Sequence, residues 1–380
     1  MAKKKTQNFL KKNYLVFYVL TGVFVMGGVF FFLGYLFPYK YNVADADIKK
    51  DLRVIEATSS TPSMNTLDTV AYDKKMLQLA NYPAPKPIST STKKTASSTS
   101  ATSTTSHHAW PVKTVYPNAG ALLPFNRIVA YYGNFYSKSM GVLGQYPPDE
   151  ALSRLKTEVA KWQAADPSTP VIPAIDYIAI TAQGSAGADG KYRARMPDTQ
   201  IDKAIDLASQ VNGIVILDIQ VGLSNLQTEL PIYEKYLKMP QVHLAIDPEF
   251  AMHNGQKPGG YIGSFDATDV NYAANYLAKL VRDNNLPPKI LVVHRFTEEM
   301  VTNYKKITPL PEVQIVMDMD CWGIQARKLN TYRQVIQLEP VQFTGFKLFY
   351  KNDYREKGSS MLTDSQVLNL QPQPSFIQYQ

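Results

Sequence analysis

Short apolar runs recur from residue 127 onward, and most of them end in a polar or charged side chain. The clearest run starts at Val242 and ends in Asp247-Pro248-Glu249. Val, Leu, Ala and Ile bounded by turn residues are typical of a parallel strand that is covered on both faces. Because side chains alternate along a strand, Asp247 and Glu249 point to the same side. Adjacent carboxylates are costly unless they are compensated or used, although a helix cap and a loop acid would give the same pattern.

The pattern predicts eight strands separated by helices or long connections. The strands are expected at 128–132, 171–180, 213–220, 242–249, 290–293, 313–317, 345–350 and 376–379. Helices are expected at 149–165, from 198 or 199, at 224–240, from 268 or 269, from 297, and at 324–338. This order matches an α/β protein with a TIM (β/α)8 barrel, formed by residues 127–380. Since no helix follows the last strand, we expect the closing helix either to be missing or to be replaced by residues upstream of Arg127, such as 119–123.

An open doubly wound sheet is the alternative fold. It usually has fewer strands and often a G-x-G-x-x-G turn after the first strand. The nearest sequence here is Tyr132-Gly133-Asn134, which does not fit that pattern. The barrel is therefore the favoured fold.

In a TIM barrel the active site lies at the C-terminal ends of the strands. Every predicted strand contributes at least one polar group at that end, which a barrel kept only for stability would not need. The candidates are Tyr132, Asn134, Asp176, Asp218, Gln220, Asp247, Glu249, His294, Asp318, Asp320, Lys347 and Gln378. Trp322 joins them as a platform for a sugar ring or as ordinary packing at the rim.

Some of these residues also have purely structural interpretations. Asp176 could be a buried, hydrogen-bonded acid, and His243 is better explained as a core histidine than as a ligand. Lys347 is expected to neutralise an acid at the rim. Cys321 follows an apolar strand, which favours a structural thiol over a nucleophile, and a single cysteine excludes an intramolecular disulfide.

The first 126 residues differ from the rest in composition. Residues 14–37 carry no charge and are long enough to cross a bilayer, and lysines precede them. We therefore expect a cytoplasmic segment at 1–13, an uncleaved transmembrane signal-anchor at 14–37 and a stalk at 38–126, all of it extracytoplasmic after Lys40. Residues 83–109 are rich in Ser, Thr and Pro and predict a disordered tether, whereas 68–82 predict a short amphipathic helix.

The positive charge also lies in this N-terminal part. Residues 1–126 hold 15 Lys and Arg against 6 Asp and Glu, and residues 127–380 hold 25 against 26, which gives +9 and −1 and the net charge of +8. The basic balance therefore does not indicate a nucleic-acid groove in the barrel.

Two short motifs carry a resemblance to known barrels. Asp247-Pro248-Glu249 resembles the D-x-E end of strand four in chitinase-type and lysozyme-type glycoside hydrolases, and Met317-Asp318-Met319-Asp320 resembles the strand-six motif of chitinases. The resemblance implies that Glu249 is the general acid, with a pKa raised by Asp247, and that Asp247 orients a substrate acetamido group. The chain departs from chitinases at Val242 and Ala245, and it also looks like membrane-anchored bacterial surface proteins that carry such barrels.

Three functions follow from these observations. The first is a membrane-tethered extracytoplasmic glycoside hydrolase without a cofactor, which acts on a glycan of the cell envelope or the surroundings through Glu249, Asp247, Asp318 and Asp320. The second is a metal-dependent hydrolase, for example of phosphodiesters, in which Asp218, Asp247, Glu249 and His294 hold a divalent cation. The third is a barrel that binds a cell-wall glycan without turning it over.

Overall fold

The computed structural model describes residues 66–82 and 109–380, and within them the chain forms a (β/α)8 barrel. The closed ring is parallel throughout, because β1 pairs with β2 on one side and with β11 on the other. Its strands are β1 (Arg127–Gly133), β2 (Val171–Ala182), β4 (Ile214–Ile219), β5 (Val242–Ile246), β7 (Lys289–Arg295), β9 (Val313–Met319), β10 (Phe343–Leu348) and β11 (Phe376–Tyr379). The predicted barrel fold is confirmed. The predicted span at 14–37 and most of the predicted tether lie outside the described residues.

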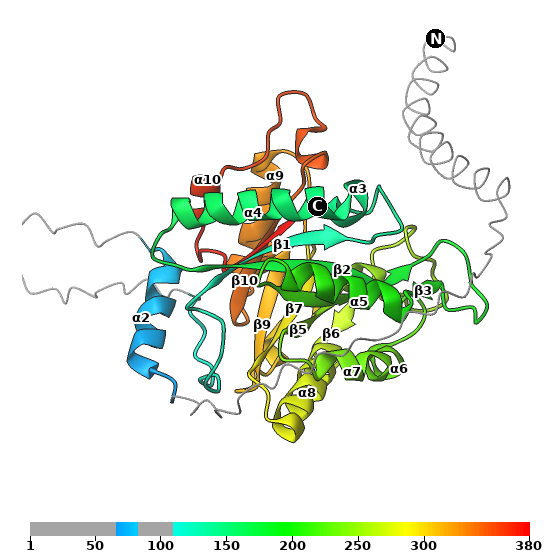
Figure 1. Ribbon diagram of the computed structural model, residues 1–380, viewed down its shortest axis with the longest axis horizontal. Helices are drawn as coiled ribbons and strands as arrows, with labels where there is room; N and C mark the ends of the chain where they lie inside the picture. The colour runs from blue at the N-terminus through cyan, green and yellow to red at the C-terminus, as the bar shows by residue number, and fades with distance from the viewer. Residues whose placement is uncertain (1–65, 83–108) are drawn as a thin grey trace, which may run out of the picture. The chain divides into compact units, whose positions relative to one another are not determined.

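Amphipathic helices cover the outside of the ring (Figure 1). The longest are α4 (Pro148–Ala165) and α8 (Ala267–Asn284), with α5 (Asp198–Ser209) and α9 (Gln325–Tyr332) further along the chain. In α8 the predicted apolar face, including Val270 and Leu277, is buried. Among these and the other described helices, none is long and apolar enough to cross a membrane.

Two connections differ from the helices that the sequence predicts. After β7 the expected helix from Thr297 is absent, and the chain forms β8 (Val301–Thr302) and a 3-10 turn (Tyr304–Lys306). The buried Arg295 explains this, since its guanidinium donates to the carbonyl oxygens of Thr297, Glu298 and Val301, which a helix would use internally.

The connection from β4 to β5 is the second difference. Instead of one helix at 224–240 it contains α6 (Leu226–Glu229), a 3-10 turn (Leu230–Tyr233) and α7 (Glu234–Leu237). Pro231 lies within the 3-10 turn and has no N–H to continue a helical hydrogen-bond ladder. The smaller elements are α3 (Val142–Gln145), α10 (Asp364–Leu368), a π-helical turn (Arg333–Gln337), 3-10 turns at Pro248–Phe250 and Asn352–Tyr354, β6 (Phe265–Asp266), which pairs with β8, and β3 (Arg193–Arg195), which is antiparallel to β2.

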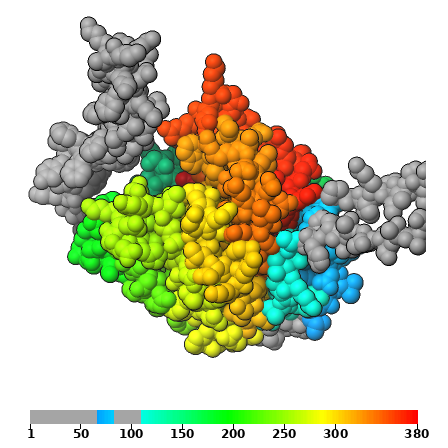
Figure 2. Space-filling view, turned by 180° about the vertical axis from the view of Figure 1, so that it is seen from behind, coloured from blue at the N-terminus to red at the C-terminus, as the bar shows by residue number. Residues whose placement is uncertain are grey.

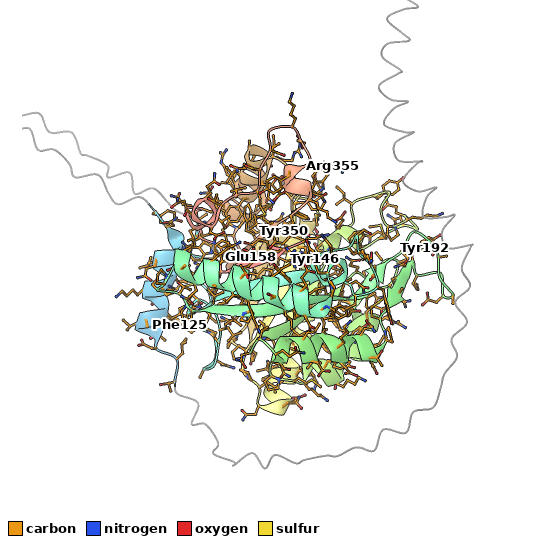
Figure 3. All side chains as sticks on the ribbon, turned by 45° about the horizontal axis from the view of Figure 1, so that its top comes forward. Phe125, Tyr146, Glu158, Tyr192, Tyr350 and Arg355 are labelled. Carbon is orange, nitrogen blue, oxygen red and sulfur yellow. The ribbon has the colours of Figure 1, made fainter. Side chains whose placement is uncertain are left out.

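The N-terminal end of the barrel is closed by segments that precede β1. The helix α2 (Thr69–Ala80), capped by Asp68, confirms the predicted amphipathic helix, and its buried side chains share one apolar cluster with the first residues of the strands. The segment 109–126 completes this floor beside α2, as Figures 2 and 3 show. Leu123 has no exposed surface, and its backbone N–H and C=O both bond the side-chain amide of Gln314.

This floor corrects two predictions. Residues 119–123 do not form a helix that replaces a missing outer one, because Leu123 lies under the barrel interior. The domain also starts before residue 127, since α2 and 109–126 pack on the barrel instead of forming part of a stalk. The physical reason is that a barrel exposes the apolar interior at its lower end unless another segment covers it.

Candidate active site

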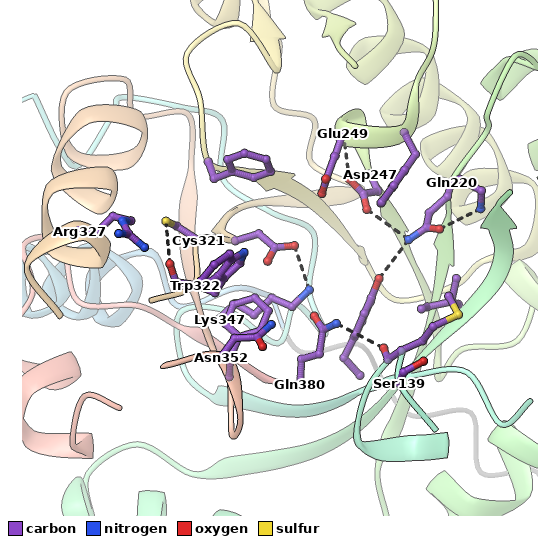
Figure 4. A pocket seen from close by; sticks show the side chains of 18 residues that line it. Ser139, Gln220, Asp247, Glu249, Cys321, Trp322, Arg327, Lys347, Asn352 and Gln380 are labelled. Atoms are coloured by element: carbon purple, nitrogen blue, oxygen red, sulfur yellow. Dashed lines mark hydrogen bonds and ion pairs between the residues drawn. The ribbon is translucent and has the colours of Figure 1, made fainter. Parts of the chain in front are cut away.

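A cavity of about 500 Å³ opens at the C-terminal ends of the strands. Several of the predicted site residues line it, and Figure 4 shows how they surround it. They are Tyr132, Gln220, Asp247, Glu249, Asp320, Trp322 and Lys347. These side chains lie at or just after the C-terminal ends of β1, β4, β5, β9 and β10.

Asp247 holds the turn that presents Glu249 to the cavity. Its Oδ1 accepts a hydrogen bond from the backbone N–H of Glu249 at 3.0 Å, which caps the 3-10 turn Pro248–Phe250. Its Oδ2 lies 3.4 Å from Nε2 of Gln220, and Gln220 also donates to the Tyr132 hydroxyl at 3.2 Å. The adjacent carboxyls of the D-x-E sequence thus have different positions: Asp247 is buried at the end of β5, and Glu249 is partly exposed.

The Glu249 carboxyl has a pKa raised to about 7. Burial is the largest cause, and the negative charge of Asp320 adds to it, while Lys347 and His294 act in the opposite direction. The sequence predicts that Asp247 raises this pKa, but the charge that raises it is that of Asp320. The repulsion between the carboxyls of the D-x-E sequence acts on Asp247 instead: burial raises its pKa well above the usual value, the charge of Glu249 adds to this, and His294 opposes it.

Asp320 is the ionised carboxylate of the cavity. Lys347 Nζ lies 2.9 Å from its Oδ2, and the ammonium also lies 3.8 Å from the centroid of the Tyr132 ring. Burial alone would raise the pKa of Asp320, but Lys347 and His294 outweigh it and hold that pKa below its ordinary value. Lys347 therefore neutralises an acid, as the sequence predicts.

The other predicted polar residues form a buried layer beneath the cavity. His294 lies at its centre, with Nε2 2.9 Å from Asp218 Oδ2 and Nδ1 3.3 Å from Asp320 Oδ2 and 3.4 Å from Asp318 Oδ2. Gln378 donates to Asp176 at 2.6 Å. Asp176, Asp218, His294, Asp318 and Gln378 all have 0 % exposed surface, so they do not line the cavity. They act on it only through their neighbours.

This layer is electrostatically unusual. Burial would lower the pKa of His294, but its contacts with Asp218, Asp318 and Asp320 raise that pKa well above its ordinary value. Burial raises the pKa values of Asp176 and Asp318, which shifts both toward the neutral acid. Asp318 Oδ1 lacks a hydrogen-bond partner among the described residues, and its Oδ2 has the 3.4 Å contact with His294 Nδ1. Protonation of Asp318 would reduce the cost of burying it.

A glycine makes room for Asp318. A Cβ at Gly345, opposite Asp318 on β10, would approach Asp318 Oδ1 to 2.5 Å. A larger residue would therefore displace the acid or the strand. The glycine at position 345 of β10 therefore leaves the space that the Asp318 carboxyl occupies.

The alternative metal set is not assembled in the structure. Both ring nitrogens of His294 face carboxylate oxygens, Nε2 that of Asp218 and Nδ1 those of Asp318 and Asp320. Within residues 66–82 and 109–380, no group of three or more His, Cys, Asp or Glu side chains could hold a metal ion. Asp218, Asp247, Glu249 and His294 are therefore explained by contacts with one another and with Gln220 instead of by shared ligation.

One histidine, His243, and one asparagine, Asn134, have structural roles. His243 is buried, and its Nδ1 accepts a hydrogen bond from the Ile290 backbone N–H at 3.0 Å, which confirms a core histidine. Asn134, a predicted site residue, is buried outside the cavity, where it donates to the Ile178 carbonyl and accepts from the Tyr136 N–H. Asn134 thus fixes the turn after β1.

The remaining lining residues were not singled out from the sequence as part of the site. Most lie in loops, whereas Ile178 and Ala182 lie on β2 and Arg327 lies in α9. Cys321 was expected to be structural and lines the cavity, although burial raises the pKa of its thiol and disfavours the nucleophilic thiolate. The other lining residues are Ser139, Met140, Ile178, Ala182, Phe250, Phe296, Arg327, Phe349, Asn352 and Gln380. Their only signal in the sequence is nearness to a strand end, because loops lack periodicity.

The barrel has distant structural relatives among proteins of different chemistry. Thermotoga maritima Cel5A, solved with cellobiose, is 11% identical and aligns over 67% of this chain and 88% of its own at a TM-score of 0.38. Burkholderia cenocepacia dihydropteroate synthase is 13% identical over 68% and 86% at 0.32, and GH26C from Muricauda sp. is 10% identical over 66% and 70% at 0.27. No protein-family model and no curated protein matches the chain. With TM-scores this low, these similarities define neither a family nor a function.

Proposed function

We propose that this protein is a glycoside hydrolase that cleaves a glycan by acid/base catalysis. The observation that carries the proposal is the pair of carboxyl groups in the cavity. Glu249 has a pKa of about 7, and Asp320 is held ionised by Lys347. Two carboxyl groups in opposite protonation states are what glycosidic bond cleavage requires.

Glu249 is the general acid in this proposal. A carboxyl with a pKa near the working pH is protonated often enough to donate and is still acidic enough to transfer its proton to the leaving oxygen. Asp247 is a positioning residue, since its Oδ1 fixes the backbone of Glu249 from below. This differs from the family resemblance, in which Asp247 would orient an acetamido group.

Asp320 supplies the negative charge. An ionised carboxylate stabilises the oxocarbenium-like transition state, whether it acts as a nucleophile or activates water. Lys347 and His294 hold the pKa of Asp320 below its ordinary value, whereas at Glu249 burial and the charge of Asp320 outweigh these two cations. Asp320 is therefore charged at a pH at which Glu249 is still protonated. Asp318, which the sequence also suggested as catalytic, is assigned to the buried layer that supports His294.

The predicted signal-anchor at 14–37 supports a substrate outside the cytoplasm. We include this location in the proposal: a membrane-tethered enzyme that acts on a cell-envelope or environmental glycan.

The test is release of reducing sugar by the purified full chain in mild detergent. The substrates are chitin, peptidoglycan, cellulose and a polyuronate, with and without EDTA. We expect wild-type activity that EDTA does not affect and that falls by about 10²- to 10⁴-fold in Glu249→Gln and in Asp320→Asn. Glu299→Gln, at an exposed glutamate that does not line the cavity, is the matched control and keeps full activity.

Two results would contradict the proposal. Activity abolished by EDTA would indicate a metal-dependent hydrolase. Binding of a polysaccharide without release of reducing sugar would indicate a non-catalytic glycan-binding barrel.

A further inference from the structure

The two sides of the cavity carry different groups. Asp247 and Glu249 line one side, whereas Trp322 and Arg327 lie on the other, with Lys347 between them (Figure 4). Trp322 lies in the β9–α9 loop and Arg327 in the first turn of α9, and Arg355 approaches Trp322 from the β10–β11 loop outside the cavity. We call Trp322, Arg327 and Arg355 the basic wall.

Trp322 is an exposed aromatic ring that two guanidinium groups approach. Its exposed fraction is 39%, whereas the other tryptophans, Trp110 and Trp162, are 3% and 0% exposed. Arg327 Cζ lies 5.9 Å and Arg355 Cζ 5.6 Å from the Trp322 ring centroid. An aromatic face beside paired cations can stack on a sugar ring and bind an anion at the same place.

The guanidinium groups of the basic wall can be reached by a ligand. Arg355 is exposed on the projecting β10–β11 loop (Figure 3) and forms no ion pair within the described residues. Arg327 Nη1 lies 2.7 Å from Glu356 Oε1, but both side chains are substantially exposed. Because water screens such an ion pair, it stabilises the fold only weakly. A ligand carboxylate can therefore replace Glu356 or bind beside it.

The basic wall is held in place from beneath by a buried ion pair. Lys328 and Asp353 are both 0% exposed, with Lys328 Nζ 2.6 Å from Asp353 Oδ2. Asp353 accepts the backbone N–H of Gly323 at 3.0 Å and that of Phe349 at 3.1 Å. The Asp353 carboxylate thus fixes the β9–α9 loop at the residue after Trp322 and also the start of the β10–β11 loop, which carries Arg355. A wall ordered in advance loses little entropy on binding.

We propose that the basic wall is a subsite for a sugar residue that bears a carboxylate, such as a uronic acid. The apolar face of the ring stacks on Trp322, and the carboxylate pairs with Arg327 and Arg355. A guanidinium matches a carboxylate through two parallel hydrogen bonds, which a neutral hydroxymethyl group cannot form. The subsite depends on the proposed function in one respect: the bond to be cleaved is placed at Glu249, across the cavity from the basic wall.

The subsite is tested by binding in the Glu249→Gln variant of the full chain, which separates binding from turnover. The probes are two pairs of disaccharides, cellobiose with cellobiouronic acid and maltose with maltobiouronic acid, so that each pair differs by one carboxylate and the linkage is varied. Because Trp110 and Trp162 are buried, ligand-induced fluorescence changes report on Trp322, and calorimetry checks the affinities.

We expect a uronic acid member to bind about tenfold more tightly than its neutral counterpart, with an affinity that falls as salt is added. Arg355→Gln should reduce the affinity for the uronic acid to that of the neutral sugar and leave the latter unchanged. Trp322→Phe should remove the fluorescence signal. Lys156→Gln, which removes an exposed cation from α4, is the control and should change nothing.

The subsite and the hydrolase can fail separately. Equal affinity within both pairs, no binding of any probe, or an Arg355→Gln variant that keeps the preference would overturn the subsite and leave the hydrolase proposal standing. A carboxylate preference in a wild-type protein that hydrolyses no glycan would support the subsite and overturn the hydrolase.

Discussion

Lys347 Nζ lies 2.9 Å from Asp320 Oδ2, and this ion pair sets the protonation pattern of the cavity. Lys347 is 2% exposed and the Asp320 side chain 12%. Because water screens this buried pair little, the attraction between its charges is stronger than in a surface salt bridge. It keeps Asp320 charged, and the charge of Asp320 in turn raises the pKa of Glu249.

Lys347→Met should therefore change the acid side of the pH–activity profile. Without the ammonium, burial dominates at Asp320 and its pKa rises, so the acid limb of kcat/KM should move up by about 1–3 pH units. The measurement is kcat/KM against pH on whichever glycan is cleaved. An acid limb that stays in place would show that Asp320 is not the ionised group.

The same substitution tests stability. Removing one partner of a buried ion pair costs about 3–5 kcal/mol. Because His294 still lies 3.3 Å from Asp320 in Lys347→Met, the free energy of unfolding should fall by less than that. The double variant Lys347→Met/Asp320→Asn should recover most of the loss, since the uncompensated charge is gone. Urea denaturation of both variants separates this electrostatic cost from lost packing.

The alkaline limb should report Glu249. Because the acid form is needed and its pKa is about 7, activity should fall above pH 7 by about tenfold for each further pH unit. Glu299→Gln should give the same curve, since this side chain does not line the cavity. A profile that is flat well above pH 7 would exclude Glu249 as the acid.

The strands could be predicted because parallel strands covered on both faces are nearly continuous apolar runs that end abruptly in polar residues. Their polar ends also located the mouth of the barrel. The sequence could not show how deep each polar side chain lies. Asp218 and Asp247 end neighbouring strands, yet Asp218 belongs to the buried layer and Asp247 lines the cavity. That difference depends on register and strand tilt, which are properties of the closed ring.

The pairing of charges was also beyond the sequence pattern. The nearest carboxyl in sequence, Asp247, was expected to tune Glu249, whereas the charge that does so comes from Asp320 on another strand end. Arg327 lies in the predicted helix at 324–338 and Arg355 in a loop without a periodic pattern, so neither could be told from ordinary surface charge. Likewise, the helix after β7 was predicted from local spacing, and a single buried arginine, Arg295, binds the carbonyl groups it would have needed.

Stability should depend on pH through Lys289. This lysine is buried without a carboxylate partner, donates to the Val242 carbonyl at 2.8 Å, and has a pKa lowered by burial to about 7 from 10.5. Since its folded pKa lies below the unfolded value, the unfolded chain binds more protons between these values, and stability should rise as pH increases from about 7 to 10.

The contribution of Lys289 over that range is on the order of a few kcal/mol. Other groups titrate in the same range, so the measurement is the difference between wild type and Lys289→Met in the free energy of unfolding at several pH values. The variant should be less dependent on pH. Equal slopes for the two proteins would show that Lys289 keeps its ordinary pKa.

The floor helix should contribute to stability but not to chemistry. Leu79→Ala, at a side chain 2% exposed, should lower the free energy of unfolding by about 2–5 kcal/mol. Leu77→Ala, at a side chain 66% exposed on the same helix, is the matched control and should cost far less. Both variants should keep the activity of the wild type at temperatures where they are folded. Equal losses from the two substitutions would contradict the packing of α2 under the barrel.

The closed floor also fixes the direction in which the cavity faces. Residues 69–80 and 109–126 cover the N-terminal ends of the strands, so the cavity at the C-terminal ends is the open end of the described barrel. A ligand longer than the cavity would therefore enter and leave through the same opening. The part of such a ligand that stays outside would lie over the loops that follow the strands.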